Sequence, residues 1–292
     1  MKKYIKDIAF GVVVILMSAC SAEDKPDAGT TVIALEDDLS TKFDVFLKRE
    51  YVDTYNIQFM YKMVDAESDM NYTLVPATYA NSVKMANLVK YLCLEPYNAV
   101  APDNFLKLYF PKMIMMVGSP AYRNNGTMVL GTAEGGLKIT LYNINGLNVN
   151  NLNTLYEYYF RTIYHEFSHI LHQTKDFPND FRMITPAAYV GDSWNTISEV
   201  NARRAGFISP YSMKESNEDF VELIAYYITY TDAQWTAALT AAGTTGAPII
   251  QQKIEIVKNY LLASWDIDLD ALKAEVQTRA ANLSNVDLDN ID

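Results

Sequence analysis

All three histidines of this 292-residue chain fall within eight residues, in the segment HEFSHILH. His165 and His169 are four residues apart, so a helix is needed to bring both imidazoles onto one face, one turn from each other. Residues 152–173 predict such a helix, because apolar residues recur at helical spacing and Asn151 or Asn153 can cap its start. The apolar stripe consists of Leu155, Tyr159, Ile163, Phe167, Ile170 and Leu171.

Two imidazoles one turn apart can bind one metal ion, and Glu166 between them then lies beside the water that the metal activates. A catalytic zinc ion usually takes three protein ligands, so a third must be found. His172 lies on the same face but seven residues beyond His165, about 10 Å along a straight helix, which is too far to share one ion. His172 is therefore expected either to lie behind the zinc ligands or to lie at the protein surface. Asp192 is a second candidate, in a segment typical of a loop.

Glu218 is the third candidate. The sequence SNED at residues 216–219 fits a capping box and predicts a second helix, with Glu218 in its first turn and Glu222 one turn later. The apolar side of that helix includes Phe220, Leu223, Ile224 and Tyr227. A second helix that delivers a glutamate to zinc completes sites of the gluzincin type, so we predict His165, His169 and Glu218 as zinc ligands. The alternative is that Glu218 is a solvated acid at a helix start.

The segment YSMKESNEDFVE, residues 211–222, is similar to part of anthrax toxin lethal factor. In that protein a tyrosine lies seven residues before the zinc-binding glutamate of an E-x-F-x-E sequence, and Tyr211 and Glu218 have the same spacing. The resemblance implies that Glu218 is the third ligand and that the Tyr211 hydroxyl supports the transition state. It also implies that Glu222 is a carboxylate behind the ligands. The likeness covers the two motif helices.

A broader resemblance rests on HEFSHILHQ, on GFISPY at residues 206–211 and on EDFVE at residues 218–222. These segments resemble the zinc metallopeptidase lipoproteins associated with nutrient import, whose members are alike along most of the mature chain. The resemblance implies a zincin-like fold and a Zn²⁺ cofactor. It further implies a neighbouring TonB-dependent transporter and the substrate-binding lipoprotein of that transporter as partners.

The first residues predict an export signal, because three lysines precede an apolar run over residues 8–17 that is followed by small residues up to Cys20. That run is shorter than the roughly 20 residues that span a bilayer. Residues 1–19 are therefore expected to be a lipoprotein signal peptide, with Cys20 lipidated and residues 20–38 a flexible tether. The sequence SAED after the first cysteine resembles a signal for the outer leaflet of the outer membrane. A plain signal peptide with an incidental cysteine is the alternative.

Net charge narrows the range of partners. The chain carries −11 at neutral pH, and loss of the three lysines and one aspartate of residues 1–19 brings it to −13. A chain this acidic is a poor nucleic-acid binder. With Cys20 lipidated, Cys93 is the remaining cysteine, so no intramolecular disulfide is expected and Cys93 is interpreted as a buried small side chain. The lipid is then the predicted membrane anchor.

Patterning along residues 39–292 predicts a single α+β domain, in which a mixed α/β part comes first and a mostly helical part follows. Residues 105–110 fit either a helix or a strand, and GTAEGG at 131–136 is expected to be a turn. Before residue 152 the predicted elements are an extended segment at 55–61, a helix at 79–94, a buried strand at 113–117 and a hairpin of 127–130 with 137–142.

These residues predict a zinc-dependent peptidase acting on a peptide or protein. Glu166 would take a proton from water and return it to the leaving amine, Tyr211 would hydrogen-bond the developing oxyanion, and the hairpin would bind extended peptide by strand addition. One alternative is a non-catalytic zinc-binding accessory lipoprotein of an outer-membrane transporter. Another is a hydrolase of amides in a peptide-bearing glycan. Lysine and arginine are few near the motifs, so no pocket for anionic substrates is predicted.

Overall fold

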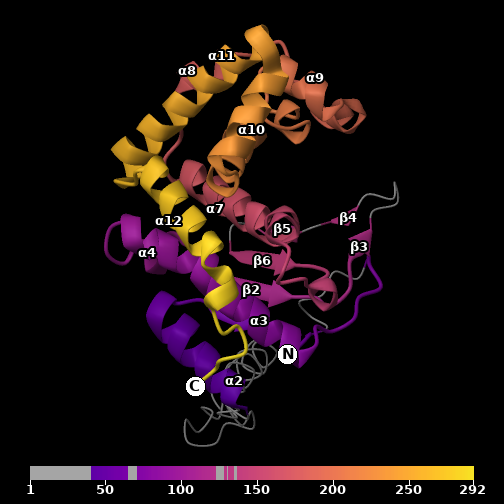
Figure 1. Ribbon diagram of the computed structural model, residues 1–292, viewed down its shortest axis with the longest axis vertical. Coiled ribbons are helices and arrows are strands. Elements are labelled where there is room, and N and C mark those ends of the chain that lie inside the picture. The colour runs from indigo at the N-terminus through magenta and orange to yellow at the C-terminus, as the bar shows by residue number, and fades with distance from the viewer. Residues whose placement is uncertain (1–40, 65–70, 123–127, 130, 135–136) are drawn as a thin grey trace, which may run out of the picture. The chain divides into compact units, whose positions relative to one another are not determined.

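The computed structural model describes residues 41–64, 71–122, 128–129, 131–134 and 137–292. The predicted signal peptide, Cys20 and the predicted tether lie outside the described residues. Strands and helices mix up to residue 141, and only helices follow (Figure 1). This order confirms the predicted α+β class. Within the described residues, no helix combines the length and the apolarity needed to span a membrane.

A four-stranded sheet has the strand order β1-β2-β6-β5. Its first three members run parallel, while β5 is an edge strand that pairs antiparallel with β6. A separate two-stranded sheet pairs β3 with β4. The strands are β1 (Gln58–Met60), β2 (Met113–Met116), β3 (Ala121–Tyr122), β4 (Met128–Val129), β5 (Gly131–Glu134) and β6 (Lys138–Leu141).

The two faces of the sheet differ because side chains alternate along a strand. Ile114 and Met116 of β2 belong to the main core, which they share with the helices. Met115 and Val117 point the other way into a small cluster with Tyr142. These methionines are therefore core residues, as the continuous apolar run at 113–117 predicts.

The predicted hairpin is correct in its second arm only. Its first arm is β5 (Gly131–Glu134), whereas residues 128–129 belong to β4 and pair with β3. Three residues separate β5 from β6, which is enough for a hairpin turn. The first four residues of GTAEGG are thus free to pair, and predicting the whole segment as a turn was wrong.

The helices of the first half share the main core with one face of this sheet. They are α2 (Lys42–Leu47), the π-helical η2 (Lys48–Asp53), α3 (Tyr79–Val89), the π-helical η4 (Lys90–Leu94), α4 (Glu95–Val100) and α5 (Phe105–Tyr109). The predicted helix at 79–94 is confirmed and continues to residue 100. The predicted extended segment at 55–61 is strand only at Gln58–Met60, because the preceding helix runs to Tyr55 and Asn56 ends it with a φ of 57°. Asparagine tolerates this left-handed conformation better than most residues.

The second half begins with the 3-10 helix η5 (Ile144–Gly146) and is helical throughout. Its further helices are α6 (Leu152–Leu155), the π-helical η6 (Tyr156–Phe160), α7 (Arg161–Thr174), α8 (Asn179–Arg182), the 3-10 helix η7 (Gly191–Thr196), α9 (Glu199–Arg204), the 3-10 helix η8 (Tyr211–Met213), α10 (Ser216–Thr229), α11 (Asp232–Trp265), α12 (Leu269–Ala281) and the 3-10 helix η9 (Leu283–Asn285). In Figure 1, α7 lies between the sheet and the helices α9, α10 and α11.

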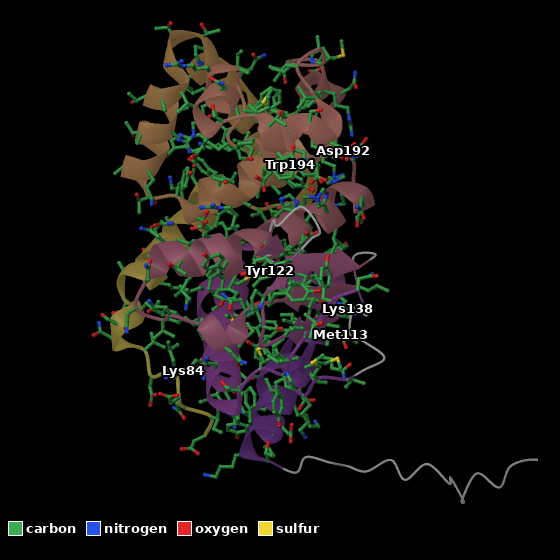
Figure 2. All side chains as sticks on the ribbon, turned by 90° about the vertical axis from the view of Figure 1, so that its right-hand side faces the viewer. Lys84, Met113, Tyr122, Lys138, Asp192 and Trp194 are labelled. Carbon is green, nitrogen blue, oxygen red and sulfur yellow. The ribbon has the colours of Figure 1, made fainter. Side chains whose placement is uncertain are left out.

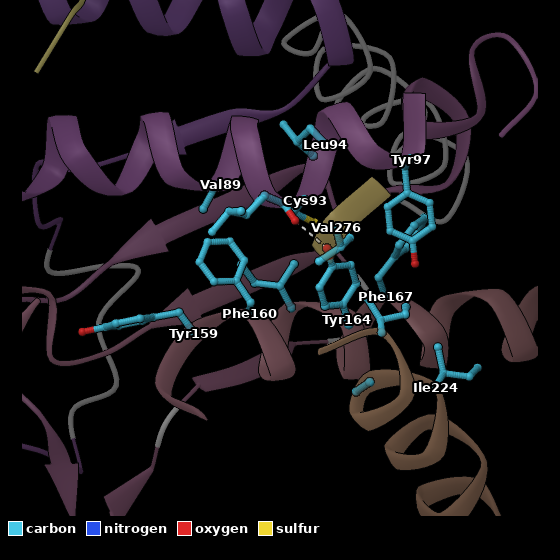
Figure 3. Packing of buried hydrophobic residues seen from close by; sticks show 14 of the residues in the cluster. Val89, Cys93, Leu94, Tyr97, Tyr159, Phe160, Tyr164, Phe167, Ile224 and Val276 are labelled. Atoms are coloured by element: carbon cyan, nitrogen blue, oxygen red, sulfur yellow. Dashed lines mark hydrogen bonds between the residues drawn. The ribbon is translucent and has the colours of Figure 1, made fainter. Parts of the chain in front are cut away.

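The helix of the histidines is continuous from α6 through α7, and the Asn151 side chain caps it by accepting from the backbone N–H of Thr154. The predicted straight α-helix is interrupted by the π-helical η6. This turn shifts the helical phase, so Tyr156 and Phe160 are buried together with the predicted stripe. Tyr164 donates a 2.5 Å hydrogen bond to the carbonyl of Leu92, which joins α7 to η4 in the core (Figure 3). Cys93 lies in the same core, fully buried and unpaired.

The helix of Glu218 forms as predicted, but the predicted capping box does not. Glu215 is the N-cap of α10 and its side chain caps nothing. Asp219 instead turns into the interior, where one of its oxygens lies 2.7 Å from the ammonium of Lys253 on α11. An unpaired buried charge costs more free energy than a missing helix cap, so the ion pair determines the position of Asp219. The partner helix α11 contains a break at Gly243, whose φ of 70° and ψ of −169° are non-helical.

Candidate metal centre

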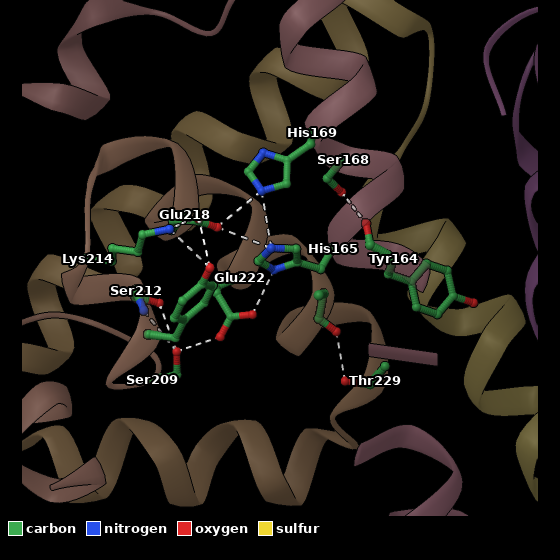
Figure 4. A network of polar contacts seen from close by, with 12 residues as sticks. Tyr164, His165, Ser168, His169, Ser209, Ser212, Lys214, Glu218, Glu222 and Thr229 are labelled. Carbon is green, nitrogen blue, oxygen red and sulfur yellow. Dashed lines mark hydrogen bonds and ion pairs between the residues drawn. The ribbon is translucent and has the colours of Figure 1, made fainter. Parts of the chain in front are cut away.

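The helices α7 and α10 bring three potential metal ligands together. The Nε2 atom of His165 lies 3.2 Å from Nε2 of His169 and 3.2 Å from Oε2 of Glu218. The Nε2 atom of His169 lies 3.1 Å from the same Oε2 (Figure 4). The three atoms thus form a nearly equilateral triangle. Among the described residues, this is the group of histidine, cysteine and acidic side chains that could hold a metal ion.

The size of the triangle suits zinc. Tetrahedral zinc with bonds of about 2.0–2.1 Å places neighbouring ligand atoms about 3.3 Å apart. The observed separations of 3.1, 3.2 and 3.2 Å come close to this value. A catalytic zinc ion leaves its fourth position to water or substrate. The donor set therefore fits a zinc ion with one open position.

Glu222 lies behind His165, away from the triangle. Its Oε1 is 2.8 Å from Nδ1 of His165, and its Oε2 accepts a 2.6 Å hydrogen bond from the hydroxyl of Ser209. The Ser209 oxygen in turn accepts from the backbone N–H of Ser212 at 3.1 Å. A carboxylate bound to the far nitrogen fixes the orientation of an imidazole and increases its basicity. The structure thus places Glu222 where the sequence predicted, whereas Ser209 carries no signal in its spacing.

His172 is buried and lies outside the triangle. Its Nε2 is 3.0 Å from Nδ1 of His169, so it contacts a ring of the donor set from behind. The helix α7 runs unbroken past it to Thr174. The sequence predicted that His172 does not share one ion with His165 and His169. The unbroken helix explains why its ring lies outside the triangle. Burial lowers the pKa of His172 to about 4.

The second oxygen of Glu218 contacts two groups from the preceding turn. Its Oε1 accepts a 3.0 Å hydrogen bond from the Tyr211 hydroxyl and lies 2.9 Å from the ammonium of Lys214. The same ammonium is 3.3 Å from the Tyr211 oxygen. Lys214 was not among the site residues predicted from the sequence, although its spacing, three residues after Tyr211 and four before Glu218, is a signal for it.

The 3-10 helix η7 packs against η8, which begins at Tyr211. The ring of Trp194 packs edge-on against the ring of Tyr211, with the centroids 4.9 Å apart. Figure 2 shows Trp194 and Asp192 close together on this side of the protein. Asp192 is exposed in η7 and is not part of the donor set. The predicted loop is a 3-10 helix here.

The charges of the site hold one another in place. Burial works to lower the pKa of His165, but the carboxylates of Glu218 and Glu222 outweigh it and raise that pKa to about 10. Burial works to raise the pKa of Glu218, yet hydrogen bonds to the histidines and to Lys214 keep it well below its usual range. Burial, followed by the charge of Glu218, raises the pKa of Tyr211 to about 12. Tyr211 is therefore a neutral hydrogen-bond donor at ordinary pH.

Glu166 lies next to His165 on α7 and interacts with the other charged groups of the site without a hydrogen bond to them. Within the described part of the chain, its carboxylate has neither a hydrogen bond nor an ion pair. Burial raises the pKa of Glu166, and the neighbouring histidines oppose that rise. A half-buried carboxylate without a hydrogen-bond partner, one residue from His165 on the same helix, is available for proton transfer.

The chain also matches a known protein family and a solved structure. Residues 36–270 match the family described as "Putative zinc-binding metallo-peptidase". The chain belongs to this family. A crystal structure of a putative zinc-binding metallo-peptidase from Bacteroides caccae is 40% identical, with a TM-score of 0.79. The match covers 90% of the present chain and 100% of the other. No curated protein matches significantly.

Membership of this metallopeptidase family confirms the zincin-like fold and the zinc cofactor predicted from the sequence. The family places the protein among the zinc metallopeptidases, a class of hydrolases that act on peptides or proteins. The donor triangle on α7 and α10 is the place in the described structure where a metallopeptidase of this family can hold its ion.

Proposed function

We propose that this protein is a zinc-dependent peptidase with an HExxH motif and a gluzincin-type third ligand, in which His165, His169 and Glu218 bind the ion. The triangle of ligand atoms carries this proposal, because its three edges of 3.1–3.2 Å suit tetrahedral zinc. Glu222 orients the ring of His165 from behind, and His172 contacts the ring of His169 without joining the triangle.

When bound, zinc supplies a Lewis acid that makes water nucleophilic near neutral pH and polarises the scissile carbonyl. Glu166 accepts the proton of the attacking water and returns it to the leaving amine, for which its unpaired carboxylate is well suited. The Tyr211 hydroxyl, which donates to Oε1 of Glu218 in this structure, would turn to hydrogen-bond the oxygen on which negative charge develops. Loss of a contact of this kind costs about 3 kcal/mol of transition-state stabilisation. Lys214, next to that hydroxyl, orients it and adds positive charge.

The substrate is proposed to bind along β5. This edge strand pairs with β6 on one side only, and α7 lies close to it. The unpaired backbone groups of an edge strand can bind an extended peptide as an additional strand. An extended substrate would then pass over the face of α7 that carries the histidines.

We further propose that the protein is a lipoprotein of the outer membrane, anchored through Cys20, exposed at the cell surface and linked to nutrient import by a TonB-dependent transporter and its substrate-binding lipoprotein. The lipobox-like sequence before Cys20 and the resemblance of the motif segments support this placement. An import-linked peptidase would act on peptides before their uptake.

The decisive experiment is a peptide-library digest with the purified full chain, with and without a chelator, read by mass spectrometry. The chelator should abolish cleavage, and zinc should restore it. Glu166→Gln should retain zinc but lose about a hundredfold or more in turnover, because an amide cannot accept the proton. Metal analysis of this variant separates the two effects.

Turnover of Glu166→Gln close to that of the unaltered protein would remove Glu166 as the base. If the unaltered, zinc-loaded protein cleaves no peptide, the non-catalytic accessory role remains. Cleavage confined to peptide-bearing glycans would support the glycan-amide alternative.

A further inference from the structure

Arg161 begins α7, one turn before His165 and on the same face of the helix. Its guanidinium lies 4.0 Å from the centre of the Tyr226 ring and 5.5 Å from that of Tyr230. Among the described residues, it has no hydrogen-bond acceptor and no ion-pair partner. Its Nε atom is fully buried without a partner, although the residue as a whole is partly exposed.

This lack of a carboxylate partner sets Arg161 apart from the other partly buried arginines of the described chain. Each of those three forms an ion pair: Arg182 with Asp176, Arg203 with Glu199, and Arg279 with Glu95. Desolvation of a charge costs free energy unless a counter-charge or hydrogen bonds compensate. Contact with two tyrosine rings offsets part of this cost and leaves the donors of the guanidinium unused.

A second guanidinium lies nearby. Arg203 reaches from α9 to Tyr230, whose hydroxyl accepts a 3.1 Å hydrogen bond from its Nη2. Tyr230 therefore has one arginine at its ring and another at its hydroxyl. Glu199 neutralises Arg203 from the exposed side, so the group as a whole keeps one positive charge. This positive charge lies in a chain whose net charge is −11.

The pair Arg161–Tyr226 lies one helical turn from the contact between His165 and Glu222. Tyr226 follows Glu222 by one turn on α10, and Glu222 contacts His165, which follows Arg161 by one turn on α7. Four residues of helix advance about 6 Å, which corresponds to about two residues of extended peptide. A peptide held across the donor triangle can therefore bring a group two residues away to Arg161.

We propose that Arg161 binds a carboxylate of the peptide substrate, about two residues from the bond that is cleaved. The planar guanidinium offers paired donors that match the two oxygens of a carboxylate. The carboxylate belongs either to an aspartate or glutamate side chain or to the C-terminus of the peptide. This inference rests on the proposed peptidase function and specifies its substrate class.

The test uses the zinc-loaded full chain and a neutral peptide that it cleaves. Glutamate and glutamine are placed in turn at each of the three positions on either side of the scissile bond, and every peptide is made as free acid and as amide. The unaltered protein should prefer the carboxylate in one register by about tenfold or more in kcat/KM, as expected for a charge-assisted bidentate contact. Arg161→Gln should reduce this ratio to near one. A preference that follows the glutamate assigns the side chain, and one that follows the free acid assigns the terminus.

Arg204→Gln is the matched control, because Arg204 is an exposed neighbour of Arg203 on the same helix and should keep the ratio unchanged. Arg161→Lys keeps the charge but loses the paired donors, so an intermediate ratio is expected. This variant carries the test if Arg161→Gln does not fold. A ratio that Arg161→Gln leaves intact, or the absence of any preference in the unaltered protein, overturns the inference.

Binding of the same peptides, labelled with a fluorophore, to zinc-loaded Glu166→Gln separates this inference from the proposed function. If nothing is cleaved but binding still favours the carboxylate in an Arg161-dependent way, the peptidase proposal fails and the carboxylate site stands. If peptides are cleaved but their binding does not depend on the carboxylate, the peptidase proposal stands and the carboxylate site fails. Equal binding of acidic and neutral peptides without cleavage overturns both.

Discussion

The two oxygens of Glu218 have different neighbours. Oε2 faces the two imidazoles, whereas Oε1 is held by Tyr211 and Lys214. A carboxylate fixed in this way presents one oxygen to an ion and cannot easily rotate. Substitutions of Glu218 and of the residues around it should therefore change zinc binding to different extents.

Replacing Glu218 should have a larger effect on zinc content than replacing His172. Glu218→Ala is expected to lose most of its zinc on dialysis, because two imidazoles alone remain. His172→Ala should retain zinc, because its ring lies outside the triangle. Metal analysis of both variants checks this, with the exposed N-cap variant Glu215→Ala as the control.

The opposite pattern would place the third ligand on α7. If His172→Ala empties the site while Glu218→Ala keeps its zinc, the helix must break after His169 when the ion binds. The assignment of Glu218, and with it the roles of Tyr211 and Glu222, would then be wrong.

Lys214 should affect zinc affinity without being a ligand. Lys214→Met is expected to weaken zinc binding about tenfold, because hydrogen-bonded partners of ligands typically contribute at least this factor. Arg at this position should restore most of the affinity. Competition with a chromophoric chelator measures it, and Lys84→Met is a matched control because that lysine is 31% exposed, against 30% for Lys214. Equal affinities for Lys214→Met and the unaltered protein would show that the lysine is only a surface contact.

The sequence predicted the parts of the site that depend on local spacing. His165, Glu166 and His169 share one helix, and Tyr211 and Glu218 lie within one short segment. The arrangement of each group is therefore fixed by its own stretch of chain. The meeting of the two helices was predicted from the general pattern of gluzincin-type sites and from the resemblance to lethal factor, because no spacing within one stretch of chain fixes it. Arg161 and Tyr226 are neighbours because of how α7 packs on α10, for which no single stretch of sequence carries a signal.

At the scale of secondary structure, the ion pair between Asp219 and Lys253 ties α10 to α11. Both side chains are 1% exposed, and the lysine also donates to the Gly206 carbonyl at 3.0 Å and lies over the Phe207 ring. The Tyr189 hydroxyl donates to the same aspartate oxygen at 3.0 Å. Asp219, the residue next to Glu218, is thus held by two side chains, Lys253 and Tyr189.

Breaking this pair should destabilise the fold strongly. Lys253→Met is expected to lower the free energy of unfolding by about 3–5 kcal/mol, because it leaves a buried carboxylate unpaired. The double variant with Asp219→Asn should recover part of the loss, since no buried charge remains. Urea unfolding measures both, and Lys258→Met on the same helix is the control. A loss below about 1 kcal/mol for Lys253→Met would mean that water reaches Asp219.

The elements that the sequence misassigned share a physical cause. The hairpin arm and the capping box were assigned from residue types that favour turns and caps, namely the glycines of 131–136 and Ser216. In the structure, strand pairing decides the first and a buried ion pair decides the second. The ranges 79–94 and 152–173, which carry long apolar repeats, were correctly predicted to be helical. In both, burial of the apolar face and the local preference of the residues favour a helix.

At the scale of the whole molecule, the proposed membrane attachment is a lipid on Cys20, which follows the lipobox-like sequence. Cys20→Ala should therefore release the protein from the membrane while leaving it folded and able to bind zinc. Cell fractionation and metal analysis check both points. Cys93→Ala is the control, since that cysteine lies in the core and should not affect the anchor. Retention of Cys20→Ala in the outer-membrane fraction would contradict lipid anchoring.

The grouping of every histidine of the chain at one centre has a practical consequence for spectroscopy. Growth on ¹⁵N-labelled histidine would label the rings at the proposed zinc site and no other ring in the protein, provided that no affinity tag adds histidines. The Nδ1 of His165, facing Glu222, and the Nδ1 of His169, facing His172, should give distinct chemical shifts that report the tautomer of each ring. One three-residue spectrum could thus follow metal uptake, substrate binding and each variant directly, without a reaction to assay.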